Sequence, residues 1–409
     1  MVRATCCPDG AERGLLLGVD HTRTRSPHDP ACIFLVLPLQ NARTIASPDT
    51  NPPEMRHHPP KDTVRKAVIH KFDPDPYKSI VLVSEPLRPP KRTEVQVAVL
   101  YAGFAGSEVN MGRGTYPGQP SPPFTPGYAM VGRVLSLGPS ARRGFAPGDV
   151  VAALTVYGAD AERINVDERH LIHVPADVDL PVAAALPLNW CTALGLVEHC
   201  AKVQQGHKVF VHGLSGAVGQ AAMTLCLQKG GTVYGTASAR NHAQLRSWGA
   251  HPFVYTDKAW VAAMRELGGV DAVLDPLGYE SWDESYSILA TSRPSVLVGY
   301  GLNLRSIQGD GRERVVKSAK LETARQLAEM ARLQAFNLKL WEYRSARFFA
   351  ISRDSKTYTA DLERLLALVK AGDVTVPIKK VWDLEDVREA HRNWGKAEGM
   401  GSVVIRVSD

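Results

Sequence analysis

The sequence predicts an α/β protein in which a doubly wound parallel sheet is inserted into a β-barrel-like domain built from both ends of the chain. Short β-rich runs separated by Pro, Gly and Asp turns begin at Val64 and predict an antiparallel, barrel-like region. From Leu186 onward, strand-like runs alternate with helical stretches, which indicates a parallel sheet with right-handed crossovers. After a helical pattern at residues 359–371, short β runs return. The tail therefore resembles the first region resumed.

Length and composition agree with two domains of a globular protein. The 409 residues exceed the roughly 250–300 at which one core stops growing. Hydrophobic residues at 44% and charged residues at 22% exclude a wholly disordered, collagenous or membrane-spanning chain. We expect one domain from residues 61–185 and 357–409, and a second domain from residues 186–356. The net charge of +6 is too mild and too dispersed to predict nucleic-acid binding.

Residues 1–60 differ from the rest of the chain. They hold nine of the 28 prolines, six arginines, no lysine and six acids, without sustained periodicity. This pattern predicts a disordered extension, or a start codon placed too early with Met55 as the true start. The apolar run at 33–39 is too short to span a bilayer, for which about 20 residues are needed. Six cysteines without a C-x-x-C motif favour a reducing, cytoplasmic location and no membrane partner.

A glycine-rich turn is the strongest local motif. GLSGAVG at residues 213–219 follows an apolar strand and precedes a helical run. Glycines permit a tight turn, and a helix N-terminus presents free N–H groups to a pyrophosphate. We expect this turn to bind a dinucleotide through Gly213, Ser215, Gly216, Ala217, Val218 and Gly219.

The end of the next strand indicates which coenzyme is used. An NAD site needs an acid there for the ribose 2′-hydroxyl, whereas an NADP site needs hydroxyl and cationic groups. No acid lies between Gly230 and Tyr255. We therefore predict NADPH, with Ser238, Arg240 and Tyr255 around the 2′-phosphate.

Two later strands end in further site candidates, because a doubly wound sheet binds its ligand at the carboxyl ends of its strands. Gly299, Tyr300 and Gly301 close one strand, and the two glycines would let the backbone approach the nicotinamide. Asp275 closes another strand, and we interpret it as a carboxylate that caps a loop. Between Ser318 and Leu338, apolar residues near helical spacing predict a helix packed on the sheet, with these residues on its packed face: Leu321, Ala324, Leu327, Ala331 and Leu338.

From about Val64 to Val407 the chain resembles the medium-chain dehydrogenase/reductase superfamily, and within it the zinc-independent quinone oxidoreductase-like and enoyl reductase-like members. The resemblance is carried, among other segments, by AGFAGSEVNMGRGTYPG, PPFTPGYAMVGRVLSLG, VFVHGLSGAVGQAA, VDAVLDPLG and GSVVIRV. It implies a split GroES-like catalytic domain, a Rossmann domain between its parts, and a homodimer.

The resemblance also implies that no catalytic zinc is bound. The ligand positions of the zinc-dependent relatives fall on Ala105, on Tyr128 beside Ala129, and near Leu188. None of these side chains supplies the thiolate, imidazole or carboxylate that zinc needs. Cys191, three positions from the last ligand place, is interpreted as a packed hydrophobic residue.

Family positions in the substrate cleft fall on Ala105, Asn110 and Tyr116, and Tyr128 points toward the same cleft by homology. We expect Tyr128 and Tyr116 to bind a carbonyl or donate a proton, with Asn110 in support. Thr192 matches a position near the nicotinamide and diphosphate. The Lys that relatives often carry before the last strand is replaced here by Ser402. This cationic contact with the coenzyme is therefore either lost or supplied by Arg344 or Arg347.

These features favour an NADPH-dependent, zinc-free reductase of the carbon–carbon double bond of an α,β-unsaturated carbonyl or quinone. Without a Lewis acid, a conjugated acceptor suits the site better than a simple ketone, because charge delocalises onto its oxygen. One alternative is a stand-alone enoyl reductase of thioester-bound polyketide or fatty-acyl chains. An alternative of another class is an NADPH-binding protein or cyclase-like catalyst without net redox chemistry.

Overall fold

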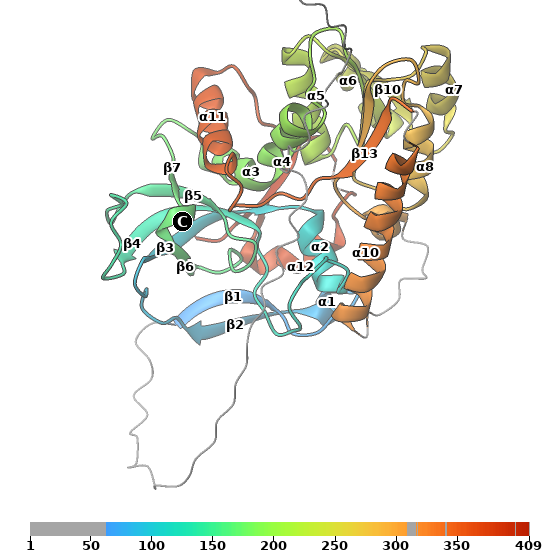
Figure 1. Ribbon diagram of the computed structural model, residues 1–409. Helices are drawn as coiled ribbons and strands as arrows, with labels where there is room; N and C mark the ends of the chain where they lie inside the picture. Colours follow the sequence, from blue (N-terminus) through green and yellow to red (C-terminus); the bar gives the residue numbers. More distant parts are fainter. Residues whose placement is uncertain (1–62, 309–315, 317, 340–341, 397, 409) are drawn as a thin grey trace, which may run out of the picture. The chain divides into compact units, whose positions relative to one another are not determined.

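The structure is a computed structural model that describes residues 63–308, 316, 318–339, 342–396 and 398–408 (Figure 1). The predicted disordered extension of residues 1–60 lies outside the described residues. The sections below concern the described part of the chain.

A seven-stranded, mainly antiparallel sheet with an added hairpin forms the barrel-like region. Its strands follow the order β14-β15-β3-β4-β5-β7, and β6 also pairs with β3. The elements of the first part are β1 (Thr63–Ile69), α1 (Pro76–Ser79), β2 (Ile80–Pro86), β3 (Glu94–Phe104), α2 (Gly106–Arg113), β4 (Ala129–Leu137), β5 (Val150–Leu154), β6 (Arg163–Asp167), η1 (Glu168–His170) and β7 (Ile172–His173).

The end of the chain completes this sheet. Strand β15 (Ser402–Arg406) pairs antiparallel with β3, with Ile405 opposite Ala102, and β14 (Ile378–Asp383) pairs parallel with β15. The other elements of this part are α11 (Tyr358–Ala371), η6 (Leu384–Asp386) and α12 (Val387–Arg392). The predicted fold class, with a barrel-like domain assembled from both ends of the chain, is confirmed.

The six-stranded sheet between these parts is entirely parallel. Its order β10-β9-β8-β11-β12-β13 is the doubly wound arrangement in which the strand order reverses beside the first strand, here β8. The strands are β8 (Lys208–His212), β9 (Thr232–Ala237), β10 (His251–Val254), β11 (Ala272–Asp275), β12 (Ser295–Gly299) and β13 (Arg344–Phe348). The reversal point places the ends of β8 and β11 where such sheets bind ligands.

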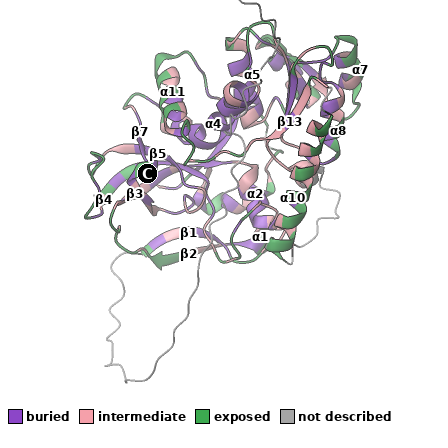
Figure 2. Cartoon of the chain, in the orientation of Figure 1, coloured by how far each residue is buried: buried purple, intermediate pink, exposed green. Residues whose placement is uncertain are grey.

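Helices flank this sheet on the connections between its strands. They are α5 (Ala217–Gln228), η4 (Ala239–Asn241), α6 (His242–Ser247), α7 (Ala259–Glu266), α8 (Glu280–Ser287), α9 (Leu304–Gln308), α10 (Ala319–Ala335) and η5 (Phe336–Leu338). In Figure 2 the strands are mostly buried, whereas α7 and α10 present exposed residues.

One helical run of the described chain is long and apolar enough to cross a membrane, and its packing explains its apolarity. Residues Leu180–Cys200 contain α3 (Leu180–Ala185), η2 (Leu186–Trp190), α4 (Cys191–Leu194) and η3 (Gly195–Cys200). Of its most apolar window, 78% is buried inside the protein. Helix α11 packs against this run at α4, and the two lie side by side in Figure 1. The run serves as a core helix in this structure.

The predicted helix at residues 318–338 is present as α10 and η5 and contacts strand β13 of the parallel sheet, as predicted, but the residues expected to face the sheet are wrong. Leu321 and Leu338, assigned to the packed face, are 55% and 75% exposed. The buried positions are Leu333 and Gln326, and the Gln326 side-chain amide donates a hydrogen bond to the carbonyl of Thr115. The helix therefore makes a polar contact with the loop after α2. The spacing of apolar residues cannot predict such a contact.

Candidate functional site

The glycine-rich turn has the geometry of an anion-binding helix N-terminus. Strand β8 ends at His212, Gly213 takes a left-handed φ of +72°, and Gly216 begins α5 without a capping side chain. A Cβ on Gly219 would lie 2.1 Å from the Gly213 carbonyl oxygen, so only glycine lets the helix pack this closely on the turn. The turn is partly exposed, and the first N–H groups of α5 are free to meet a phosphate.

Candidates for the 2′-phosphate gather at the ends of β9 and β10. Ser238 follows β9 directly, and Arg240 lies in the short turn η4. Because Val254 of β10 pairs with Ala237 of β9, the next residue, Tyr255, lies beside Ser238 at the same sheet edge. Tyr255 is 57% exposed and therefore accessible to a ligand.

The two glycines after β12 have packing roles of their own. A Cβ on Gly299 would lie 2.9 Å from the indole nitrogen of Trp282, and one on Gly301 would lie 2.6 Å from the carbonyl oxygen of Pro276. The Tyr300 N–H donates to the Asp275 carbonyl oxygen over 3.0 Å, which ties this loop to the end of β11. The close packing explains both glycines without a coenzyme, so their predicted contact with nicotinamide stays a prediction.

A buried polar network connects the carboxyl ends of three strands, and sequence reasoning missed most of it. Asp275 accepts hydrogen bonds from the Leu277 and Gly278 N–H groups, as the loop-capping interpretation predicted. Its other carboxylate oxygen accepts from Ser281 and Ser285, each over 2.7 Å. The set extends through His212, whose imidazole nitrogens lie 3.0 Å from Ser285 Oγ and 3.3 Å from Thr236 Oγ1.

This network reaches the phosphate-binding turn itself. Thr236 Oγ1 accepts a hydrogen bond from the Gly213 N–H over 3.2 Å. Burial lowers the pKa of His212, so the imidazole is neutral and bridges two hydroxyl groups without adding charge. The turn after β8 and the loop after β11 are thereby held in a fixed relation.

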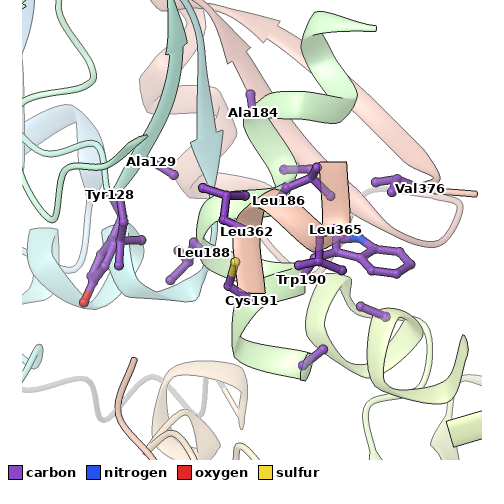
Figure 3. Packing of buried hydrophobic residues seen from close by; sticks show 14 of the residues in the cluster. Tyr128, Ala129, Ala184, Leu186, Leu188, Trp190, Cys191, Leu362, Leu365 and Val376 are labelled. Carbon is purple, nitrogen blue, oxygen red and sulfur yellow. The ribbon is translucent and has the colours of Figure 1, made fainter. Parts of the chain in front are cut away.

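Tyr116 and Tyr128 form a pair in the catalytic domain. Their hydroxyl oxygens are 2.7 Å apart, and their rings meet edge to face with centroids 5.8 Å apart. Figure 3 shows Tyr128 at the border of an apolar cluster with Leu188 and Cys191, its hydroxyl pointing out of that cluster. The structure thus brings together two of the three predicted catalytic side chains.

The two phenols differ in their surroundings. Burial raises the pKa of both, and the shared hydrogen bond raises the pKa of Tyr116 further while it opposes the rise for Tyr128. Either hydroxyl can be the donor, so the shared bond uses one phenol proton and leaves the other. When Tyr116 is the donor, the Tyr128 O–H is available to an external acceptor such as a carbonyl oxygen.

Glu108, which sequence reasoning did not single out, supports the backbone of this pair. Its carboxylate accepts hydrogen bonds from the N–H groups of Tyr128 and Ala105, over 3.0 and 3.1 Å, and from Ser107 Oγ over 2.6 Å. Burial raises its pKa to about 7. Nearby Asp160 is also buried, its pKa is raised to about 8, and neither of its carboxylate oxygens has a partner in the described chain. The sequence did offer a signal for Glu108, because it lies three residues after Ala105 at the start of α2, where a Glu side chain can accept a hydrogen bond from the N-cap N–H.

Asn110 is held by the other domain. Its amide nitrogen donates to Asn303 Oδ1 over 2.8 Å, and its amide oxygen accepts from Ser306 Oγ over 2.7 Å. These bonds use one of the two N–H groups and one of the two oxygen lone pairs of the amide, and its predicted contact with substrate stays a prediction. Thr192, predicted to lie near the nicotinamide, is 7% exposed on α4, which packs against α5.

Comparison with known proteins identifies the family. Residues 91–176 match a family described as the alcohol dehydrogenase GroES-like domain, and residues 248–405 match one described as zinc-binding dehydrogenase. The chain belongs to the medium-chain dehydrogenase/reductase superfamily. Its branch is that of the quinone oxidoreductase-like and VAT-1 proteins; the motifs predicted the quinone oxidoreductase-like members and did not indicate the VAT-1 proteins.

Relatives extend over most of the chain. The synaptic vesicle membrane protein VAT-1 homolog of Homo sapiens is 29% identical over 80% of this chain and 83% of its own length. Quinone oxidoreductase-like protein 2 of Bos taurus is 28% identical over 78% of this chain and 86% of its own. The structure of the mycobacterial protein Rv1454c with NADPH superposes with a TM-score of 0.68 at 24% identity, covering 85% of this chain and 100% of that one.

The zinc-ligand positions of this superfamily member carry the wrong chemistry for the metal. Ala105 and Leu188 are apolar, and Tyr128 offers only its phenol. Burial raises the pKa of the Cys191 thiol well above its usual value, which disfavours a thiolate ligand. Among the described residues no three His, Cys, Asp or Glu side chains gather where they could hold a metal. These side chains do not fit a catalytic zinc.

The cation expected to replace the family lysine is not Arg344. That guanidinium is paired with Glu342 over 2.6 Å and lies over the Tyr286 ring at 4.5 Å, so it is already engaged. The strand start at Ser402 nevertheless meets the coenzyme turn, because the Gly401 N–H donates to the Ser215 carbonyl over 3.2 Å.

Proposed function

We propose that this chain is a zinc-independent, NADPH-dependent reductase that transfers a hydride to the conjugated double bond of an α,β-unsaturated carbonyl or quinone. The observation that carries the proposal is the Tyr116–Tyr128 pair, which leaves one phenol proton directed away from an apolar cluster at a position where metal-dependent relatives bind zinc. A hydrogen-bond donor there suits an acceptor whose negative charge is delocalised.

The glycine-rich turn supports the coenzyme part of the proposal. The close approach at Gly219 and the open N-terminus of α5 fit a pyrophosphate. Ser238, Arg240 and Tyr255, at one sheet edge, suit a 2′-phosphate better than a free ribose hydroxyl. Thr192 and the Gly299–Gly301 loop would complete the nicotinamide side of the site.

When bound, NADPH supplies the hydride. The protein's part is to hold the substrate oxygen against the Tyr128 O–H, with Tyr116 fixing the orientation of that hydroxyl. Because burial raises the pKa of Tyr128, the phenol stays protonated and acts as a hydrogen-bond donor to the enolate or hydroquinone oxygen. The apolar side chains of Leu188 and Cys191 exclude water and strengthen this hydrogen bond.

The test is Tyr128→Phe, which removes one hydroxyl and keeps the ring. We expect kcat to fall at least about tenfold, equivalent to about 1.4 kcal/mol in the barrier, with NADPH affinity unchanged. Tyr77→Phe is the matched control, since Tyr77 is 45% exposed and bonds to Glu389 outside the site. An unchanged kcat in Tyr128→Phe would remove this residue from the mechanism.

The substrate class is tested by following NADPH absorbance with enones, quinones, acyl-CoA enoyl thioesters and carrier-bound enoyl thioesters in parallel. Turnover of free enones or quinones supports the proposal. Turnover of carrier-bound thioesters alone would favour the stand-alone enoyl reductase. Binding of NADPH without consumption across the whole panel would favour a function without net redox chemistry.

A further inference from the structure

Lys379 is a half-buried cation without an anionic partner among the described residues. It lies on β14 at a β-bulge: Ile378 pairs with Ser402 and Lys380 pairs with Val403, so Lys379 is the extra residue at this step. Its Cβ lies 3.3 Å from the position of a Cβ on Gly399, which places the base of its side chain against the loop before β15. No hydrogen bond or ion pair engages its ammonium group within the described chain.

Arg240 is a second cation whose charge acts on Lys379. Burial lowers the pKa of Lys379, and the charge of Arg240 lowers it further, so the two groups lie within reach of each other's fields. Arg240 is exposed in the turn after β9 and likewise has no ion-pair partner among the described residues. The positive charges of two nearby cations repel each other, and a bound anion would relieve that repulsion.

The position of this cation pair connects it to the coenzyme turn. Strand β15 pairs with β14, and Gly401, directly before β15, bonds to Ser215 of the glycine-rich turn. Arg240 follows Ser238 at the carboxyl end of β9, the strand that pairs with β8. Lys379 therefore approaches from the C-terminal segment and Arg240 from the end of β9.

We propose that Lys379 and Arg240 together bind the 2′-phosphate of NADPH, and that Lys379 supplies the cation that this chain lacks at Ser402. The inference rests on the proposed function. A phosphate dianion suits this pair, because an arginine fork contacts two oxygens while an ammonium group acts as a point charge. Lys379 becomes a specificity-determining residue that distinguishes NADPH from NADH.

The experiment compares Lys379→Met with Lys380→Met by calorimetric titration of the full chain. Lys380 is the matched control, because it is the next residue on the same strand but is exposed and lies over the Trp382 ring. The probes are NADPH, NADH and 2′,5′-ADP. Lys379→Met is expected to weaken NADPH and 2′,5′-ADP by about tenfold or more, as for other charged hydrogen bonds, and to leave NADH unchanged. Lys380→Met should leave all three unchanged.

Parallel weakening of NADPH and NADH would place Lys379 at the shared pyrophosphate and overturn the inference, as would unchanged binding of every probe. Wild-type protein that binds NADPH no better than NADH would instead overturn the coenzyme part of the proposed function. Loss of folding cannot mimic the expected result, because it would reduce NADH binding too. Since Lys379 has no partner to lose, Lys379→Met should melt no lower than wild type.

Discussion

Gly219→Ala tests the packing of helix α5 on the phosphate-binding turn. The added Cβ would lie 2.1 Å from the Gly213 carbonyl oxygen and 3.2 Å from Leu214 Cα, whereas ordinary contacts lie at 3.4–4 Å. These are backbone atoms, so the helix and turn must separate by about 1 Å. Overpacking of this kind costs about 1–3 kcal/mol. Alanine has a helix propensity up to about 1 kcal/mol more favourable than that of glycine. Subtracting this gain from an overpacking cost of about 3 kcal/mol, we expect the free energy of unfolding to fall by about 2 kcal/mol.

Gly112→Ala makes the same chemical change in helix α2, where there is room. The nearest atom to its added Cβ would be Ser79 Oγ at 3.4 Å, so the propensity gain is kept and the variant should be slightly more stable than wild type. The assay is urea denaturation of both variants without coenzyme, followed by titration with NADPH.

The denaturation midpoint should fall in Gly219→Ala and rise slightly in Gly112→Ala. NADPH binding should weaken in Gly219→Ala only, because a shift of about 1 Å misplaces the N–H groups of the turn. If Gly219→Ala were as stable as Gly112→Ala, the close contact between α5 and the turn would be refuted. The candidate coenzyme site would then lose its main geometric support.

Two further predictions concern buried ionisable groups. Burial raises the pKa of the Asp160 carboxyl from 3.8 to about 8 in the folded protein. Between these pH values the unfolded state has lost a proton that the native state keeps. The free energy of unfolding therefore falls as pH rises. In Asp160→Asn that fall should be smaller, so its stability relative to wild type should increase from about pH 4 to about pH 8; parallel curves would contradict this. Cys191, Cys200 and Cys226 are buried, and peptides carrying them should stay unlabelled by iodoacetamide without denaturant but become labelled in urea. Rapid labelling of Cys191 in the native protein would contradict its packed position.

Short motifs with one geometric solution could be predicted from the sequence. The run from Gly213 to Gly219 requires a tight turn at a helix start, and the structure has that turn with a left-handed Gly213. The return of β runs after residue 371 predicted that the tail rejoins the first domain, and β15 does pair with β3. Both inferences depend on local sequence patterns that predict the same structure whatever the details of side-chain packing.

Contacts between distant residues could not be predicted in this way. The Ser285–His212 contact joins positions 73 residues apart, and no periodicity marks it. The exposed leucines of α10 show the same limit, because that helix contacts the catalytic domain through Gln326. Lys379 could not be singled out from the sequence, because its position depends on a β-bulge. A bulge redirects a side chain, and amino-acid composition does not predict where one occurs.

The substitutions at the zinc-ligand positions make chemical sense as a set. Removing the metal removes a Lewis acid, and an apolar pocket would then offer nothing to a developing oxyanion. Under the proposed function, Ala105 and Leu188 make the position apolar, while Tyr128, where zinc-dependent relatives have an imidazole ligand, offers a hydroxyl donor that Tyr116 orients. A neutral donor in an apolar, water-poor setting gains strength from the low dielectric, although it stabilises less charge than a divalent ion. The proposed site would therefore suit acceptors that spread their charge over a conjugated system better than acceptors that form a localised alkoxide.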